Sequence, residues 1–265
     1  MTAQVAPTQH REQERKEVDR VVIRFAGDSG DGMQLTGERF TSATAFFGND
    51  LATLPDYPAE IRAPAGTIPG VSAFQIQFSD HDILTPGDQP GVLVAMNPAA
   101  LKANIKDLIP GGLLIVNKDS FEKRNLDKAG YDANPLEDHS LEKYQTYEVP
   151  MTSITQGAVK DIGLTKKEAG RSKNMFALGL VSWMFGRSLE PTVVWLEQKF
   201  AKKPQIARAN VAALKAGHAF GETAELTAYE VKPATLAPGT YRRITGNQGL
   251  AYGLVPASVQ AKLPL

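Results

Sequence analysis

The stretch Val21–Phe47, VVIRFAGDSGDGMQLTGERFTSATAFF, decides the fold that we predict for this chain. It begins with an apolar run, Val21–Gly27, that is typical of a strand buried in a parallel sheet. The glycine-rich segment GDSGDG, Gly27–Gly32, follows, and a helical pattern then runs from Met33 to Phe47. A strand, a glycine loop and a helix in this order open a βαβ unit. We therefore expect an open α/β sheet with this loop at its edge.

The same alternation continues along the chain. Further strands are expected at Leu51–Pro58, Val71–Ser79, Gly91–Asn97, Gly111–Asn117 and Thr146–Met151. Helices are expected at Pro98–Asp107, Asn174–Gly186, Pro191–Phe200 and Gln205–Glu222, the second of them apolar nearly all round and hence buried. This order predicts an α/β fold with three layers, α/β/α, a mostly parallel sheet and a helical C-terminal part.

Composition divides the chain into four segments. Residues 1–18 are polar and indicate a flexible tail, and residues 19–222 form the α/β domain. Residues 223–243 are rich in Pro, Ala and Thr, which predicts a linker. Residues 244–265 are too few to fold alone, so we interpret them as the start of a truncated domain, and the chain as a fragment or a split subunit. Pro256 lies inside the helix expected from Gln248 and should break or kink it.

The composition also excludes several classes of function. Basic and acidic residues both number 29, so the charge gives no reason to expect nucleic acid or a membrane as partner. Cysteine is absent, which excludes disulfides, a thiol nucleophile and a Cys-ligated iron–sulfur cluster in this chain. The four histidines are isolated, so no metal site is expected. No signal peptide or apolar span is visible, and we expect a cytoplasmic protein.

The glycine loop allows two interpretations. Glycines before a helix N-terminus let backbone N–H groups approach a phosphate, which makes Gly30, Asp31 and Gly32 candidate cofactor-binding residues. The carboxylates of Asp28 and Asp31 would repel a phosphate unless they are paired. The alternative is a tight turn whose Asp side chains cap the helix. The spacing G-x-x-G-x-G matches neither a dinucleotide loop nor a Walker loop.

Other candidate residues lie outside this loop. Arg62, in the Gly/Pro-rich segment after the second strand, could bind a phosphate or carboxylate, or form an ion pair with Glu60. Asn174 is expected to cap the helix that it begins. The basic residues Lys166, Lys167, Arg171 and Lys173 form either a solvated face or a phosphate site, and Trp183 and Trp195 are expected in the core or an interface. No residue is assigned a catalytic role.

Four segments, in order, resemble one family. They are RFAGDSGDGMQLTGERF (Arg24–Phe40), DYPAEIRAPAGTIPGVSAFQIQFS (Asp56–Ser79), NMFALGLVSWMFGRSLEP (Asn174–Pro191) and RRITGNQGLAYGL (Arg242–Leu254). The first three resemble the Rossmann-like gamma domain of 2-oxoacid:ferredoxin oxidoreductases. The fourth resembles the start of the pyrimidine-binding domain that follows it in the fused large (alpha) subunit.

The resemblance implies an enzyme that needs a partner. It implies a beta subunit that carries thiamine diphosphate, with magnesium, and a [4Fe–4S] cluster, in a dimer of heterodimers. The reaction would be oxidative decarboxylation of a 2-oxoacid to an acyl-CoA, with electrons passed to ferredoxin. The segment DYPAEIRAPAG favours 2-oxoglutarate over pyruvate. This chain would contribute to the coenzyme A and active-site cleft, and we expect it to be inactive alone.

The resemblance is incomplete at the C-terminus. Asn247 matches the Gly-Asn start of the pyrimidine domain and could lie near thiamine, or cap its helix. The family's Tyr-Pro-Ile-Thr-Pro-type segment and the glutamate that activates thiamine are not in this sequence. Two other functions stay open: a non-catalytic nucleotide- or CoA-binding scaffold, and a Rossmann-type dinucleotide oxidoreductase. The second is weakened by the glycine spacing and because Asp56 is its nearest candidate acid.

Overall fold

The computed structural model describes residues 15–60, 63–224 and 226–264. The chain divides into two compact units, residues 1–235 and residues 236–265, and each is described by itself. The first contains the sheet and the helices that cover it, and the second contains one helix.

A six-stranded sheet forms the centre of the first unit, in the order β3-β4-β2-β5-β6-β7. Its strands are β2 Arg20–Asp28, β3 Asp50–Asp56, β4 Val71–Ser79, β5 Val92–Ala95, β6 Leu113–Asn117 and β7 Gln145–Val149. Strand β2 pairs in parallel with β5, β5 with β6, and β6 with β7. Strand β4 runs antiparallel to both β2 and β3. The described residues of the connection from β3 to β4 contain a short 3-10 helix, Ile68–Gly70, and no crossover α-helix of the kind that joins parallel strands. The prediction of a mostly parallel sheet is confirmed.

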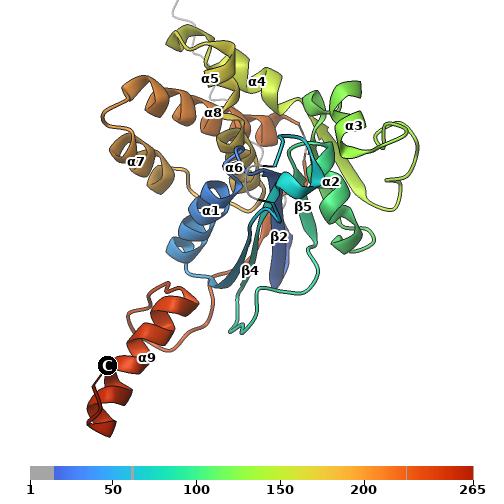
Figure 1. Cartoon of the computed structure of the whole chain (residues 1–265). Coiled ribbons are helices and arrows are strands. Elements are labelled where there is room, and N and C mark those ends of the chain that lie inside the picture. The colour runs from blue at the N-terminus through green and yellow to red at the C-terminus, as the bar shows by residue number, and fades with distance from the viewer. Residues whose placement is uncertain (1–14, 61–62, 225, 265) are drawn as a thin grey trace, which may run out of the picture. The chain divides into compact units, whose positions relative to one another are not determined.

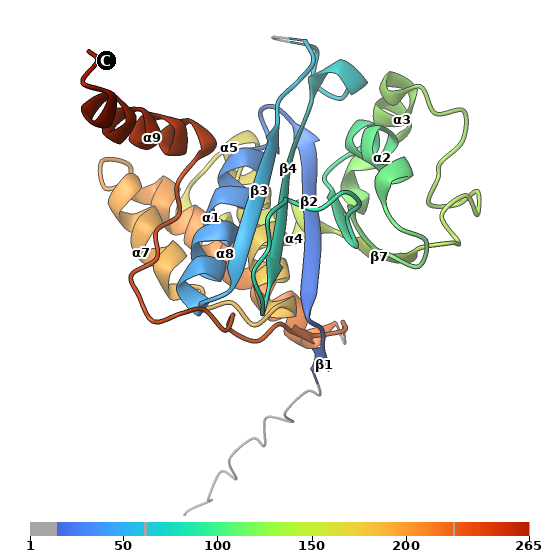
Figure 2. The same cartoon turned by 90° about the horizontal axis from the view of Figure 1, so that it is seen from below.

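Helices cover both faces of this sheet (Figures 1 and 2). One face carries α1 Met33–Phe47, α4 Met151–Ala158, α6 Lys173–Met184, α7 Glu190–Lys199 and α8 Pro204–Thr223, with the short α5 Lys166–Gly170 beside α4. The other face carries α2 Pro98–Asn104 and α3 Lys123–Ala129. The predicted three-layer α/β/α architecture is therefore confirmed.

Strand β4 shows why the sheet needs both layers. Its sequence alternates only imperfectly, and each of its residues is buried. Phe74 and Phe78 belong to the core beneath α1 and α6, whereas Ala73 belongs to the core beneath α2. Gln75, a polar residue of this strand, is satisfied internally: its amide nitrogen donates to the carbonyl oxygens of Pro86 and Gly87, at 3.0 and 2.6 Å. Burial on both faces is what a central strand requires.

The segment after α8 belongs to the first unit as far as residue 235. Strand β8, Tyr229–Glu230, pairs in parallel with β1, Lys16–Glu17. Leu226 and Val231, on either side of β8, are 4% and 0% exposed. Parts of the segments that the sequence assigns to the tail and the linker are thus packed against the domain. Their apolar residues are too few to give a periodic signal.

The second unit contains α9, Gly246–Ala261, with Thr245 and Gln248 forming a capping box at its start. None of the residues of α9 is buried. The helix continues through Pro256, so of the predicted break or kink the break is wrong. A proline removes one backbone donor, and the hydrogen bonds of the flanking turns are sufficient to continue this helix.

Candidate functional site

Polar side chains gather where the parallel strands end. Strand β2 ends at Asp28, Asn97 follows β5, and β6 ends at Asn117. The Asn97 side chain accepts a hydrogen bond from the backbone of Ala100 at 2.8 Å and so caps α2. Since β2, β5 and β6 are parallel neighbours, these residues share the carboxyl edge of the sheet. Ligands of open α/β sheets bind at this edge.

One carboxylate of the glycine loop, that of Asp31, is neutralised by a lysine of α6. Asp31 forms an ion pair with Lys173, whose Nζ lies 2.8 Å from Oδ1, and both side chains are less than one-fifth exposed. Its Oδ2 accepts from the backbone N–H of Asp28 at 3.2 Å. Helix α1 begins after Gly32 with no side-chain cap. The alternative in which an Asp side chain caps this helix is therefore wrong, because Asp31 is bonded elsewhere.

Gly30 and Gly32 meet different surroundings. Gly32 has a φ of +77°, and a Cβ built on it would lie 2.6 Å from Nδ2 of Asn174. A Cβ built on Gly30 would meet nothing within 4 Å among the described residues. Gly30 is thus open to a ligand, whereas Gly32 is packed against α6.

Asn174 does not cap α6. Ser172 occupies the N-cap position, and the Asn174 side chain accepts the N–H of Met175 at 2.9 Å. The predicted capping role is wrong, because α6 begins one residue earlier, at Lys173. The buried Asn174 lies instead against the glycine loop.

Asp28 connects the glycine loop to the segment that follows β3. The N–H of Gly66 donates to both carboxylate oxygens of Asp28, at 3.1 and 3.0 Å. The N–H of Ser29 donates to the carbonyl of Gly70 at 3.1 Å. Lys128 on α3 donates from Nζ to the carbonyl of Ala65 at 3.2 Å. The two loops that were separate candidates in the sequence therefore form one surface.

The surroundings of Asp28 shift its acidity. Burial raises the pKa of Asp28 above its ordinary value of 3.8, and the neighbouring Asp31 raises it further. Hydrogen bonds from Gly66 and Asn97 and the charge of Lys173 act in the opposite direction. The loop thus holds two close carboxylates by means of N–H donors and one lysine. The described residues contain no group of three His, Asp or Glu placed to hold a metal ion.

For the remaining candidate residues, the described part of the structure shows no contact with this edge of the sheet, apart from Lys173. Arg62 lies outside the described residues. Asn247 is exposed in α9, in the second unit, and the cap of that helix is Thr245. Within the basic cluster, Lys173 pairs with Asp31, whereas Lys166, Lys167 and Arg171 are exposed.

The two tryptophans differ in role. Trp183 is 6% exposed and belongs to the core. Trp195, on α7, is partly buried, with the guanidinium of Arg39 from α1 4.2 Å from its ring centre and Nζ of Lys199 at 5.0 Å.

Sequence reasoning missed Gly66, Asn97 and Lys128 as parts of this surface. An Asn directly after a strand is a weak signal that could have pointed to Asn97. Lys128 carries no such signal, because its helix lies in a charged, turn-rich region of the sequence. Its contact depends on how α3 is placed against the loop.

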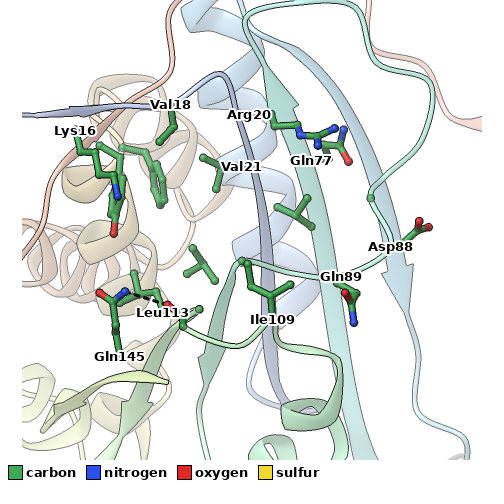
Figure 3. Close-up of a pocket in the computed structure, with 18 of the residues that line it drawn as sticks. Lys16, Val18, Arg20, Val21, Gln77, Asp88, Gln89, Ile109, Leu113 and Gln145 are labelled. Carbon is green, nitrogen blue, oxygen red and sulfur yellow. Dashed lines mark hydrogen bonds between the residues drawn. The ribbon is translucent and has the colours of Figure 1, made fainter. Parts of the chain in front are cut away.

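A cavity of about 610 Å³ lies at the opposite edge of the sheet (Figure 3). The amino ends of the parallel strands β2, β5, β6 and β7 contribute to it, with apolar side chains such as Val21, Ile109 and Leu113 and with Lys16 and Gln145 at one side. None of the residues singled out in the sequence lines it. We favour the carboxyl edge as the functional site, because the strand ends there carry the convergent polar groups.

No helix in the described part of the chain is long and apolar enough to cross a membrane.

The three-layer fold and the glycine loop at its carboxyl edge agree with a match to the pyruvate ferredoxin/flavodoxin oxidoreductase family over residues 22–220. The chain belongs to this family. It is 64% identical, over 97% of its length, to the 2-oxoglutarate oxidoreductase subunit KorA of Mycobacterium tuberculosis. It is 36% identical, over 37% of its length and 49% of the relative, to the 2-oxoglutarate synthase subunit KorC of Methanothermobacter thermautotrophicus.

Solved structures agree with this assignment. The 2-oxoglutarate:ferredoxin oxidoreductase of Magnetococcus marinus, solved with 2-oxoglutarate, coenzyme A and succinyl-CoA, matches 82% of this chain with a TM-score of 0.62 and 26% identity. The pyruvate oxidoreductase subunit PORC of Thermotoga maritima matches 76% of this chain and 97% of its own, with a TM-score of 0.51 and 20% identity, which shows a shared fold. The chain spans 40% of the KorA relative and 34% of the Magnetococcus chain.

Proposed function

We propose that this chain is the gamma-domain part of a 2-oxoglutarate:ferredoxin oxidoreductase. The observation that carries the proposal is the 64% identity to KorA over 97% of the chain. The enzyme would decarboxylate 2-oxoglutarate oxidatively to an acyl-CoA and pass electrons to ferredoxin, in the cytoplasm. The relative solved with 2-oxoglutarate and coenzyme A supports the choice of substrates.

The cofactors of the reaction belong on other domains or on a partner subunit. This chain has no cysteine, so it cannot supply thiolate ligands for a [4Fe–4S] cluster. Thiamine diphosphate supplies the electron sink that decarboxylation needs. We therefore propose a beta subunit that carries both cofactors.

The contribution of this chain would be binding at the carboxyl edge of the sheet. The N-terminus of α1 has no side-chain cap, and its backbone N–H groups favour an anion such as a phosphate of coenzyme A. Gly30 is open to such a ligand, and the pairing of Asp31 with Lys173 reduces repulsion. Gly32 sets the direction of the loop. Arg62 remains a proposed anion-binding residue.

Asn247 remains a proposed contact to thiamine diphosphate. It is exposed in α9, so its side chain is available to a partner. This proposal depends on the resemblance of residues 242–254 to the start of a pyrimidine-binding domain.

Co-expression with the neighbouring genes tests the proposed function. We expect a brown complex that reduces ferredoxin or a dye only when 2-oxoglutarate and coenzyme A are both present. Pyruvate in place of 2-oxoglutarate should give much lower activity. A colourless chain that purifies alone and binds coenzyme A would contradict the enzyme proposal and favour the scaffold.

Arg62→Ala tests the anion-binding proposal within the same complex. Loss of one charge-assisted hydrogen bond should raise the KM for coenzyme A or 2-oxoglutarate by roughly tenfold or more. Arg124→Ala, at an exposed position of α3, removes the same charge and serves as the matched control. Equal KM values in the two variants would eliminate Arg62 as a ligand residue.

A further inference from the structure

We propose that Asp28 and Lys128 are positioning residues that together fix one peptide group, Ala65–Gly66, and with it the turn formed by residues 63–70. The turn lies beside the glycine loop at the carboxyl edge, so its consequence for catalysis rests on the proposed function. The clamp itself does not depend on that function.

The side chains of Asp28 and Lys128 form hydrogen bonds with opposite ends of a single peptide unit. The carbonyl oxygen of Ala65 and the N–H of Gly66 belong to the same peptide bond. Lys128 donates from Nζ to that oxygen at 3.2 Å, and Asp28 accepts from that N–H at 3.0 and 3.1 Å. A cation at the negative end and an anion at the positive end of the peptide dipole both oppose its rotation.

The backbone of Gly66 is suited to this arrangement. Its φ is +85°, in the left-handed region that glycine adopts without a steric cost. A Cβ built on Gly66 would lie 3.3 Å from Cδ of Lys128. The stem of Lys128 therefore packs against the glycine while its amine reaches the preceding carbonyl.

The clamp joins three separate parts of the chain. Asp28 ends β2, Lys128 lies in α3, and the turn leads into β4. Within the turn, Thr67 donates from both its N–H and its hydroxyl to the carbonyl of Pro64. These internal bonds shape the turn but do not attach it to other elements. Asp28 and the Ser29–Gly70 bond attach it to the end of β2 and the glycine loop, and Lys128 attaches it to α3.

The two contacts should differ in strength. Asp28 is partly buried, and loss of its charge-assisted hydrogen bond to Gly66 should increase local opening roughly tenfold or more. Lys128 is exposed, and its contribution should be roughly two- to fivefold. Asp28 is thus the main holding residue and Lys128 the secondary one.

Hydrogen–deuterium exchange on the full chain tests the clamp without any activity measurement. Asp28→Ala should increase exchange in the peptide covering residues 63–70 by roughly tenfold, and Lys128→Met by roughly two- to fivefold. Asp28→Asn keeps one acceptor oxygen and should restore part of the protection. Asp56→Ala, at the exposed end of β3 on the same edge of the sheet, and Lys123→Met, at an exposed position of α3, are the matched controls.

Two results would overturn the clamp. One is unchanged exchange over residues 63–70 in Asp28→Ala. The other is an effect of Lys128→Met no larger than that of Lys123→Met, and this comparison decides the matter even if Asp28→Ala does not fold.

Kinetics of the assembled complex test the catalytic consequence separately. A displaced turn should raise the KM for coenzyme A or 2-oxoglutarate several-fold, with kcat changed less than roughly twofold, because binding is weakened equally in the ground and transition states. Faster exchange with unchanged KM values would overturn the positioning role. A wild-type complex without activity would overturn the proposed function. The clamp would then still be tested by the hydrogen–deuterium exchange measurement.

Discussion

At the scale of single residues, the glycine loop combines two mutually repelling carboxylates with the groups that stabilise them. Two aspartates lie close together at the head of a helix, where burial and mutual repulsion raise the pKa of Asp28. Lys173 neutralises Asp31, and Gly66 and Asn97 donate to Asp28. Such an arrangement costs stability and is typical of functional sites.

Gly32→Ala should destabilise the chain by about 1–3 kcal/mol, because alanine is strained at a φ of +77° and its Cβ would lie 2.6 Å from Nδ2 of Asn174. Gly30→Ala should change the free energy of unfolding by less than about 0.5 kcal/mol, since a Cβ there meets nothing within 4 Å among the described residues. Urea unfolding of both variants makes the comparison. Equal losses would mean that the loop does not pack on Asn174 as described.

The pH dependence of stability should reveal Asp28. A carboxyl group whose pKa is raised by folding binds its proton more tightly in the folded state than in the unfolded chain. As the pH falls from neutral through the raised pKa to about 3.8, wild type should therefore gain stability relative to Asp28→Asn. Urea unfolding of both proteins at constant ionic strength measures the difference. A difference that stays constant with pH would show that Asp28 is not perturbed.

At the scale of elements, helices α6 and α8 cross at two glycines. A Cβ on Gly179 would lie 1.9 Å from the carbonyl oxygen of Leu214, and a Cβ on Gly217 would lie 2.0 Å from that of Phe176. Both obstacles are backbone atoms, which no side-chain rotation can move. This close approach explains why an almost wholly apolar α6 can be buried between α8 and the sheet.

Gly179→Ala and Gly217→Ala should each destabilise the chain by about 3 kcal/mol, since the helices must separate and overpacking outweighs the better helix propensity of alanine. Gly157→Ala in α4 is the matched control. Its Cβ would meet nothing within 4 Å among the described residues, so it should stabilise the chain by about 0.5–1 kcal/mol. Thermal unfolding of the three variants tests the close helix crossing. An unchanged Tm for Gly179→Ala would disprove it.

The elements differ in how far the sequence predicts them. Apolar runs and helical periodicity locate β2, β5, β6 and α6 to within two residues at each end, because these elements are largely buried. The reversed direction of β4 has no local signal, since it depends on pairing with β2 and β3. The site shows the same division. The glycine loop is visible in the sequence, but its contact with Asn174, and the contact of Lys128 with the neighbouring turn, exist only after α6 and α3 have packed.

At the scale of the whole molecule, the boundary between the two units follows from burial. The first unit extends to residue 235 because the segment after α8 is anchored to it. The side-chain amide of Asn49 donates to the carbonyls of Val231 and Lys232, at 3.5 and 2.6 Å. The guanidinium of Arg187, 2% exposed, donates in turn to Asn49 at 2.5 Å. Asn49 thus holds the segment directly, and Arg187 orients the Asn49 side chain.

Truncation tests that boundary. A chain that ends after Thr235 loses the second unit, residues 236–265, whose helix α9 contains no buried residue. Its Tm should therefore stay within about 2 °C of that of the full chain. A chain that ends after Ala224 also loses β8 and the buried Leu226 and Val231.

Burial of these two side chains contributes about 1.5–3 kcal/mol each, so the shorter chain should lose at least about 3 kcal/mol and roughly 6 °C or more in Tm. Differential scanning calorimetry of the three chains provides the measurement. If both truncations lowered the Tm equally, the boundary would lie before residue 225, as the linker expected from the sequence implies, and the Asn49 network would contribute nothing to holding the segment. If residues 226–235 are packed against the domain, only the chain that ends after Ala224 should show a large loss of Tm.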